Sequence, residues 1–200
     1  MGTPDYATTI FKELLSSDYE VVGLFTQPDK PVGRKQILTP PHIKQFCIDS
    51  NLNIPIFQPL KLRGNEEAKN QIKDLKPDFI IVAAYGQILP KEILDIAPCI
   101  NLHASLLPKY SGASPIQESL LNDDNYTGVT SMLMEEGLDS GDILGFGYLK
   151  ITSNMEVTQA FEELSKIAAK LTITTLDNFK NIKPVKQNES EVSYCKKIKK

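Results

Sequence analysis

Short apolar runs alternate along the chain with longer stretches of helical periodicity. The run at 78–84 is almost entirely apolar, which favours a strand buried inside a sheet. Residues 5–17 carry an apolar stripe, which is typical of a helix packed on a sheet. The pattern predicts helices over 5–17, 41–50, 64–75, 90–96 and 156–180, a further helix starting at Ser114-Pro115, and strands over 20–26, 54–57, 78–84, 99–102, 127–134 and 143–151. This alternation predicts the α/β class, with a mostly parallel sheet and helices on both faces.

The stretch at 27–41 interrupts this pattern. It holds four prolines and Gly33, residues that end regular elements, so we expect a long loop there. The loop carries three basic side chains, Lys30, Arg34 and Lys35. Taken alone, these charges indicate a solvated surface turn.

Composition limits the kind of protein. With 200 residues, 41% of them hydrophobic, the chain can bury one core. The net charge of −3 argues against a surface that binds nucleic acid throughout, although it allows a local basic patch. The longest apolar run, 79–84, is too short to cross a bilayer. Cys47, Cys99 and Cys195 are far apart and follow no metal-ligand spacing, so we expect no metal, reduced thiols and a cytoplasmic location.

The most informative stretch reads Cys-Ile-Asn-Leu-His-Ala-Ser-Leu-Leu-Pro over residues 99–108. Asn101 and His103 are two residues apart at the end of a short apolar strand, so their side chains should point to the same face. An amide can donate to an oxygen that gains negative charge, and an imidazole can exchange a proton near neutral pH. The pair suits acyl-type transfer to an amine; the alternative is an ordinary hydrogen-bonded pair at a strand end.

A third candidate, Asp139, lies between Gly137 and Gly141 in a segment that must bend sharply. A carboxylate held by such a loop can orient an imidazole. The alternative role is that of a turn former, through hydrogen bonds of its own side chain.

Together these motifs resemble the formyltransferases that use 10-formyltetrahydrofolate, and the rest of the chain is similar to the methionyl-tRNA formyltransferase family. The resemblance covers nearly the whole chain. It rests on Gly-Thr-Pro-Asp-Tyr-Ala at 2–7, Phe-Thr-Gln-Pro-Asp-Lys-Pro-Val-Gly-Arg at 25–34, Ala-Tyr-Gly-Gln-Ile-Leu-Pro at 84–90, Asn-Leu-His at 101–103, Ser-Leu-Leu-Pro at 105–108, and the segments 128–130 and 137–142.

The resemblance implies a Rossmann-like formyltransferase fold and formyl transfer to the α-amine of methionyl initiator tRNA. In that reaction Asn101 would donate to the oxyanion, and His103 would either donate to it or take a proton from the amine. Asp139 would orient His103 or relay a proton. The implied folate site comprises Ser105, Leu106, Leu107, Pro108, Tyr85, Gly86, Ile88, Leu89, Pro90 and Asp142. We expect ordinary core packing for at least two of Ile88, Leu89, Leu106 and Leu107. Lys30, Arg34 and Lys35 would contact the tRNA.

The resemblance also divides the chain. It implies a catalytic domain over 1–184, whose first strand would precede Gly2, and a linker over 185–200 toward a C-terminal tRNA-binding domain; we expect both that strand and that domain to lie outside this sequence. The implied partners are the folate and initiator methionyl-tRNA, with no membrane, and we expect a monomer. Two other functions stay open. One is formyl transfer to a small amine, either a purine ribonucleotide intermediate or an amino sugar, and the other is a folate-binding fragment without turnover.

Overall fold

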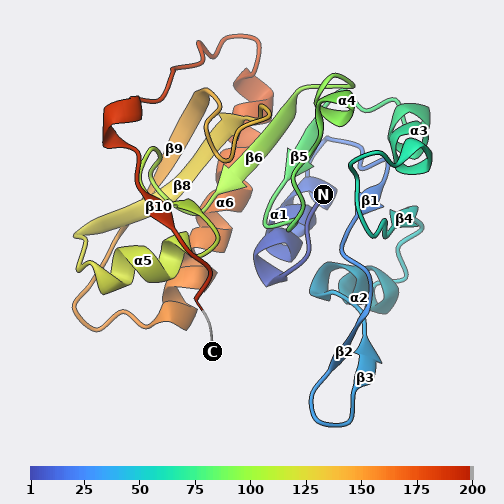
Figure 1. The fold of residues 1–200 in the computed structure, drawn as a ribbon, viewed down its shortest axis with the longest axis horizontal. Helices are drawn as coiled ribbons and strands as arrows, with labels where there is room; N and C mark the ends of the chain where they lie inside the picture. The colour runs from blue at the N-terminus through green and yellow to red at the C-terminus, as the bar shows by residue number, and fades with distance from the viewer. Residues whose placement is uncertain (199–200) are drawn as a thin grey trace.

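The computed structural model describes residues 1–198. A central sheet is flanked by helices, and a hairpin projects from one end (Figure 1). The helices are α1 (Asp5–Leu15), α2 (His42–Asp49), α3 (Glu66–Asp74), α4 (Lys91–Leu94), α5 (Pro115–Leu121) and α6 (Val157–Asn178), with a 3-10 turn, η1, at Glu189–Glu191. The strands are β1 (Leu24–Phe25), β2 (Lys30–Val32), β3 (Ile37–Thr39), β4 (Ile56–Phe57), β5 (Ile80–Val82), β6 (Cys99–His103), β7 (Ser111–Gly112), β8 (Tyr126–Leu133), β9 (Ile143–Lys150) and β10 (Tyr194–Cys195). Residues 199 and 200, the end of the predicted linker, lie outside the described residues.

Four strands form the main sheet in the order β5-β6-β8-β9. β5 and β6 are parallel, whereas β8 is antiparallel to both β6 and β9. The parallel pair β1-β4 approaches β5 through the first two residues of the chain. The Gly2 N–H donates to the Phe25 carbonyl at 3.0 Å, and the Ala83 N–H donates to the Met1 carbonyl at 3.0 Å. The predicted α/β class is confirmed, and the sheet is mixed because β8 and β9 form an antiparallel hairpin.

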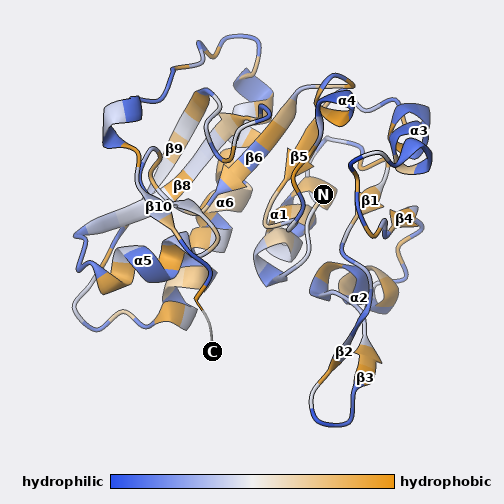
Figure 2. Ribbon diagram, viewed as in Figure 1, coloured by the Kyte–Doolittle hydropathy of each residue, from blue (hydrophilic) through white to orange (hydrophobic). Residues whose placement is uncertain are grey.

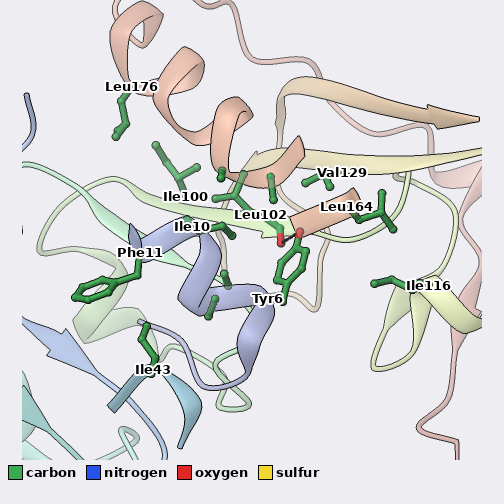
Figure 3. Packing of buried hydrophobic residues seen from close by; sticks show 14 of the residues in the cluster. Tyr6, Ile10, Phe11, Ile43, Ile100, Leu102, Ile116, Val129, Leu164 and Leu176 are labelled. Carbon is green, nitrogen blue, oxygen red and sulfur yellow. Dashed lines mark hydrogen bonds between the residues drawn. The ribbon is translucent and has the colours of Figure 1, made fainter. Parts of the chain in front are cut away.

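Helices cover both faces of the sheet. On one face α1 packs against α6 and α2, and β6 contributes Ile100 and Leu102 to the same core (Figure 3). Tyr6 is buried in the same core, where its hydroxyl donates to the Leu102 carbonyl at 3.2 Å. On the other face, Ile72 of α3 and Ile93 of α4 join a cluster around β5. One face of β6 is therefore apolar, which leaves the alternate residues of the strand for polar side chains.

Local signals explain where the helices begin. The Asn65 side chain caps α3 by accepting the Ala68 N–H at 3.0 Å. The negative charges of Glu66 and Glu67, in the first turn of α3, stabilise the helix by interacting with the positive end of its dipole. Pro115 begins α5, where its missing N–H breaks no helical hydrogen bond. Figure 2 shows the surface helix α3 as mostly hydrophilic and the buried strand β5 as mostly hydrophobic.

Two predicted elements differ from the structure. The region predicted as a loop, 27–41, contains the antiparallel strands β2 and β3, in which every residue is exposed. Because both strands are exposed, their residues show no alternation of apolar and polar positions. The loop was predicted from its prolines and Gly33. The strand predicted over 20–26 is paired as a strand only at Leu24–Phe25, against β4.

The nitrogen of Met1 lies beside β5, where it donates to the Ile81 carbonyl at 2.6 Å. A cavity of about 330 Å³ lies next to it, between residues 19–24 and 76–83. Because Asn101, His103 and Asp139 do not line this cavity, it is separate from the candidate site.

Candidate active site

Strand β6 carries two of the three predicted catalytic side chains. Successive side chains of a strand alternate faces, so Asn101 and His103 lie opposite the apolar face formed by Ile100 and Leu102. Both polar side chains are nearly enclosed, since Asn101 is 9% exposed and His103 is 7% exposed. The strand therefore presents an amide and an imidazole together at its C-terminal end.

Asp139 contacts both side chains from the loop between β8 and β9. Its Oδ1 accepts from Asn101 Nδ2 at 3.4 Å, and its Oδ2 lies 3.6 Å from His103 Nδ1. The Gly112 N–H donates to the same Oδ2 at 2.9 Å. The Asp139 side chain is only 12% exposed, so water and salt screen its charge weakly. The structure brings the three predicted catalytic residues into one cluster.

Hydrogen bonding selects the tautomer of neutral His103. Its Nε2 lies 3.0 Å from the Tyr110 carbonyl oxygen, which can only accept. Nε2 must therefore carry a hydrogen, and Nδ1 has the free lone pair when the ring is neutral. Because Nδ1 faces Asp139, a proton taken up by the ring lies beside a carboxylate.

The turn at 110–112 supports this cluster, although none of its residues was predicted to belong to the site. Tyr110 has φ +60°, a left-handed conformation that is rare for a bulky residue. Its N–H donates to Ser193 Oγ at 2.9 Å, and its hydroxyl donates to Asp124 Oδ2 at 2.8 Å. Gly112 has φ +117°, and a Cβ there would clash with the Cys195 carbonyl. A glycine at 112 is thus the one sequence signal for this turn.

The predicted folate-contacting turn, 105–108, directly follows β6. Thr130 on β8 is fully buried and holds this turn in place. The Leu107 N–H donates to Thr130 Oγ1 at 2.9 Å, and that hydroxyl donates to the Ser105 carbonyl at 2.6 Å. A cavity of about 390 Å³ adjoins the turn and is lined by Leu106, Leu107, Pro108, Lys109, Tyr110, Asp124, Asn125, Tyr126, Thr127 and Glu191. The role of Thr130 depends on the pairing of β6 with β8, which the sequence alone does not reveal.

The predicted folate residues at 84–90 form a separate group, and none of them lines that cavity. Leu89 and Pro90 are buried, whereas Gly86 and Ile88 are exposed. Tyr85 is 2% exposed, and burial raises the pKa of its hydroxyl to about 12. That hydroxyl has no hydrogen-bond partner within residues 1–198. Gly86 and Ile88 are thus the members of this group that face solvent.

The last predicted folate residue, Asp142, is half-buried just before β9. Its carbonyl accepts the Leu133 N–H at 2.9 Å, which joins the loop to the end of β8. Among residues 1–198, no group of three or more His, Cys, Asp or Glu side chains is placed to hold a metal ion. No helix in the same described range is both long and apolar enough to cross a membrane.

The predicted tRNA-binding residues lie on the hairpin formed by β2 and β3. Lys30 begins β2, Arg34 and Lys35 lie in the turn after it, and all three are exposed. The hairpin projects from the body of the domain beyond α2 (Figure 1). At its base, Lys44 Nζ donates to both carboxylate oxygens of Asp29 at 2.9 Å. The hairpin therefore combines an anchored base with an exposed basic tip.

A Rossmann-like α/β domain in which a parallel strand ends in an amide and an imidazole, beside a carboxylate from a neighbouring loop, belongs to the class of proteins equipped for acyl-type group transfer. Comparison with known proteins narrows the class. Residues 1–176 match the formyl transferase family, and the chain belongs to that family.

The chain is similar over its full length to a methionyl-tRNA formyltransferase from a Nitratiruptor species, with 62% identity over 200 residues. The chain spans 66% of the length of that relative. Phosphoribosylglycinamide formyltransferase from Bacillus halodurans has a TM-score of 0.70 and 21% identity, covering 90% of this chain and 92% of that chain. An N-formyltransferase from Helicobacter canadensis, in complex with folinic acid and dTDP-3-aminofucose, has a TM-score of 0.71 and 17% identity, covering 97% of this chain and 68% of that chain. Both structural likenesses concern the fold.

Proposed function

We propose that this chain moves a formyl group from 10-formyltetrahydrofolate to the α-amine of methionyl initiator tRNA in the cytoplasm. The observation that carries the proposal is the enclosed Asn101–His103–Asp139 cluster, which unites an amide donor, a proton acceptor and a carboxylate. Similarity over the full chain to a relative named methionyl-tRNA formyltransferase supports the choice of acceptor.

In the proposed reaction the free amine attacks the formyl carbon, and the bond from that carbon to N10 of the folate then breaks. The Asn101 amide has two N–H groups, and its contact with Asp139 is long, so it can turn a donor toward the oxyanion. His103 Nδ1 takes the proton that the amine loses, and N10 gains a proton as it leaves. The Asp139 carboxylate attracts the imidazolium that exists between these two transfers.

The folate is proposed to lie against the turn at 105–108. The adjoining cavity of about 390 Å³ falls within the size range of small-molecule sites. Leu106, Leu107 and Pro108 give it an apolar wall. Tyr110 connects the cavity to the cluster, because it lines the cavity while its carbonyl contacts His103.

The β2–β3 hairpin is proposed to contact the tRNA. An acceptor with a phosphate backbone needs positive charge outside the enclosed cluster, in a chain whose net charge is −3. The exposed side chains of Lys30, Arg34 and Lys35 supply that charge on a segment that projects from the domain.

The test is transfer of labelled formyl from 10-formyltetrahydrofolate to methionyl initiator tRNA by the full 200-residue chain. We expect labelled formylmethionyl-tRNA, and no product with the same tRNA lacking methionine. Glycinamide ribonucleotide and an amino-sugar nucleotide serve as competing acceptors, and preferential labelling of either would overturn the assignment of tRNA. Folate binding without transfer to any acceptor would instead identify a binding fragment.

A further inference from the structure

The segment predicted as a linker, residues 185–195, lies across the candidate site. Val185 pairs with Ile143 at the start of β9: the Ile143 N–H donates to the Val185 carbonyl at 2.8 Å, and the Val185 N–H donates back at 2.9 Å. Ten residues later, β10 pairs in parallel with β7. We call residues 185–195 the strap. It is fixed at both ends by backbone pairing.

Near Val185, the strap is hydrogen-bonded to the loop that carries Asp139. Gln187 Nε2 donates to the carbonyl oxygens of Asp139 and Gly141, each at 2.8 Å. Asp139 has φ +50°, a left-handed conformation that aspartate adopts more readily than most non-glycine residues. Both amide hydrogens of Gln187 are used for this one loop. The backbone that carries the Asp139 carboxylate is thus hydrogen-bonded to a residue outside β6, β8 and β9.

At its second end, the strap holds the turn that completes the cluster. Ser193 accepts the Tyr110 N–H through Oγ at 2.9 Å and the Ser111 N–H through its carbonyl at 2.8 Å. The Tyr110 carbonyl contacts His103, and the neighbouring Gly112 N–H donates to Asp139. The strap thus supports the partners of both ring nitrogens of His103.

We propose that the strap is part of the active site and that Gln187 is a positioning residue, which directs the Asp139 carboxylate toward His103 Nδ1. Gln187 acts through Asp139, since its side chain is engaged by the loop carbonyls. The kinetic part of this proposal rests on the proposed function. The structural part does not, because the contact between Asp139 and the Gly112 N–H can be observed without any substrate.

The test compares Gln187→Met, Gln187→Glu and the nearby control Lys183→Ala, which lies outside the strap, in the full chain. Met keeps the length of the side chain without a donor, and Glu places an acceptor against two carbonyls. Both Gln187 variants should lower kcat for formyl transfer about tenfold, as expected when a reacting group is misplaced by a fraction of an ångström. The Michaelis constant for the folate and the thermal midpoint should change little. Lys183→Ala, whose side chain is exposed, should match the parent.

A double-mutant cycle separates positioning from general stability. If Gln187 acts through Asp139, Gln187→Met should cost little further activity in an Asp139→Asn background. Fully additive losses would overturn the positioning role. Equal kcat for Gln187→Met and the parent would do the same.

Amide hydrogen exchange provides the readout that needs no activity. In Gln187→Met, the Gly112 N–H should exchange about tenfold faster, because its hydrogen bond to the Asp139 carboxylate is weakened. The Ala113 N–H, which donates to the Cys195 carbonyl at 3.3 Å, should keep its rate because β7 and β10 stay paired. Unchanged exchange at Gly112 would overturn the proposal even if formyl transfer is observed. Faster exchange in a chain that transfers no formyl would support the strap and count against the proposed function alone.

Discussion

The Asn101–His103–Asp139 cluster and the β2–β3 hairpin are built in opposite ways. Each side chain of the cluster is at most 12% exposed, and each has a partner contributed by another segment. Every residue of the two hairpin strands is exposed. The side-chain hydrogen bonds found within 30–39 stay inside the hairpin, from Gln36 to Gly33 and from Thr39 to Ile37. The hairpin is tied to the domain at its base, where Asp29 meets Lys44.

Under the proposed function, this difference would let one domain combine two kinds of recognition. Stabilising charge on a single oxygen requires donors that are fixed before the substrate arrives. Contact with a phosphate backbone depends on charge over a longer range and tolerates mobile side chains. Changes in the cluster should therefore lower kcat, whereas changes in the hairpin should alter the affinity for the acceptor and its salt dependence.

The largest effect is expected in the cluster itself. Asn101→Ala and His103→Ala should each lower kcat by about 100-fold or more, because each removes a group that acts on charge or protons in the transition state. Folate affinity should stay nearly unchanged. Single-turnover transfer and calorimetric folate titration measure the two effects, with Asn122→Ala, an exposed residue, as the control. Turnover within a few-fold of the parent would remove these residues from the mechanism.

Asp139→Asn should have the next largest effect. The asparagine side chain keeps the volume and can still accept the Gly112 N–H, but it lacks the charge that attracts the imidazolium. We expect kcat to fall at least about tenfold. Steady-state kinetics with Asp123→Asn as an exposed control measures this loss. If Asp139→Asn and the parent have equal kcat, Asp139 is only a turn residue.

Arg34→Ala tests the hairpin. It should raise the Michaelis constant for methionyl-tRNA and reduce the slope of tRNA affinity against salt by about one unit, as expected for one lost phosphate contact. Folate binding should not change. Arg63→Ala is a matched control, since Arg63 is also exposed but lies outside the hairpin. Identical salt slopes for both variants and the parent would make the hairpin an ordinary surface feature.

The smallest effect concerns the base of the hairpin. Hydrogen bonds from Gln58 and Lys44 lower the pKa of Asp29 below its ordinary value of 3.8. The resulting stabilisation is present above the ordinary pKa and is lost as the pH falls through the lowered pKa of the folded state. Asp29→Asn should therefore flatten the loss of thermal stability below about pH 4. The difference should be at most about 1 kcal/mol, because the pair is partly exposed.

Thermal melts of Asp29→Asn and the parent across this pH range measure the effect. Asp74→Asn, at the exposed end of α3, is the control. The same acid dependence in all three proteins would show that the Asp29 contacts contribute nothing to stability. Formyl transfer at neutral pH should be nearly the same for Asp29→Asn and the parent, which separates this base from the cluster.

The sequence predicted those parts of the molecule that have a local signature. The buried helices and strands follow from apolar periodicity, and the two-residue spacing of Asn101 and His103 follows from strand geometry. The hairpin was missed because both of its strands are exposed and β2 contains Pro31. Short exposed strands depend on pairing with each other, which leaves no periodic pattern in the sequence.

The supports of the candidate site could not be predicted for a related reason. Thr130, Tyr110 and Gln187 act through hydrogen bonds to segments that are distant in the chain. Nothing in their immediate neighbours indicates those partners. Gly112 gives a weak signal, because glycine is favoured wherever φ is positive or another backbone approaches closely.

The strap also sets the order in which the domain can be completed during synthesis. The hydrogen bond between Ser193 and Tyr110 joins residues 83 positions apart. A ribosome that adds roughly 5–20 residues per second needs about 4–17 s to make that interval. In this time α5, β8, β9 and α6 are made after β6 and can pack with it, while the Asp139 loop still lacks its contact with Gln187 and the turn at 110–112 still lacks its hydrogen bonds to Ser193. The hydrophobic core can therefore form before the candidate site is complete, so folding of most of the domain can precede assembly of the site.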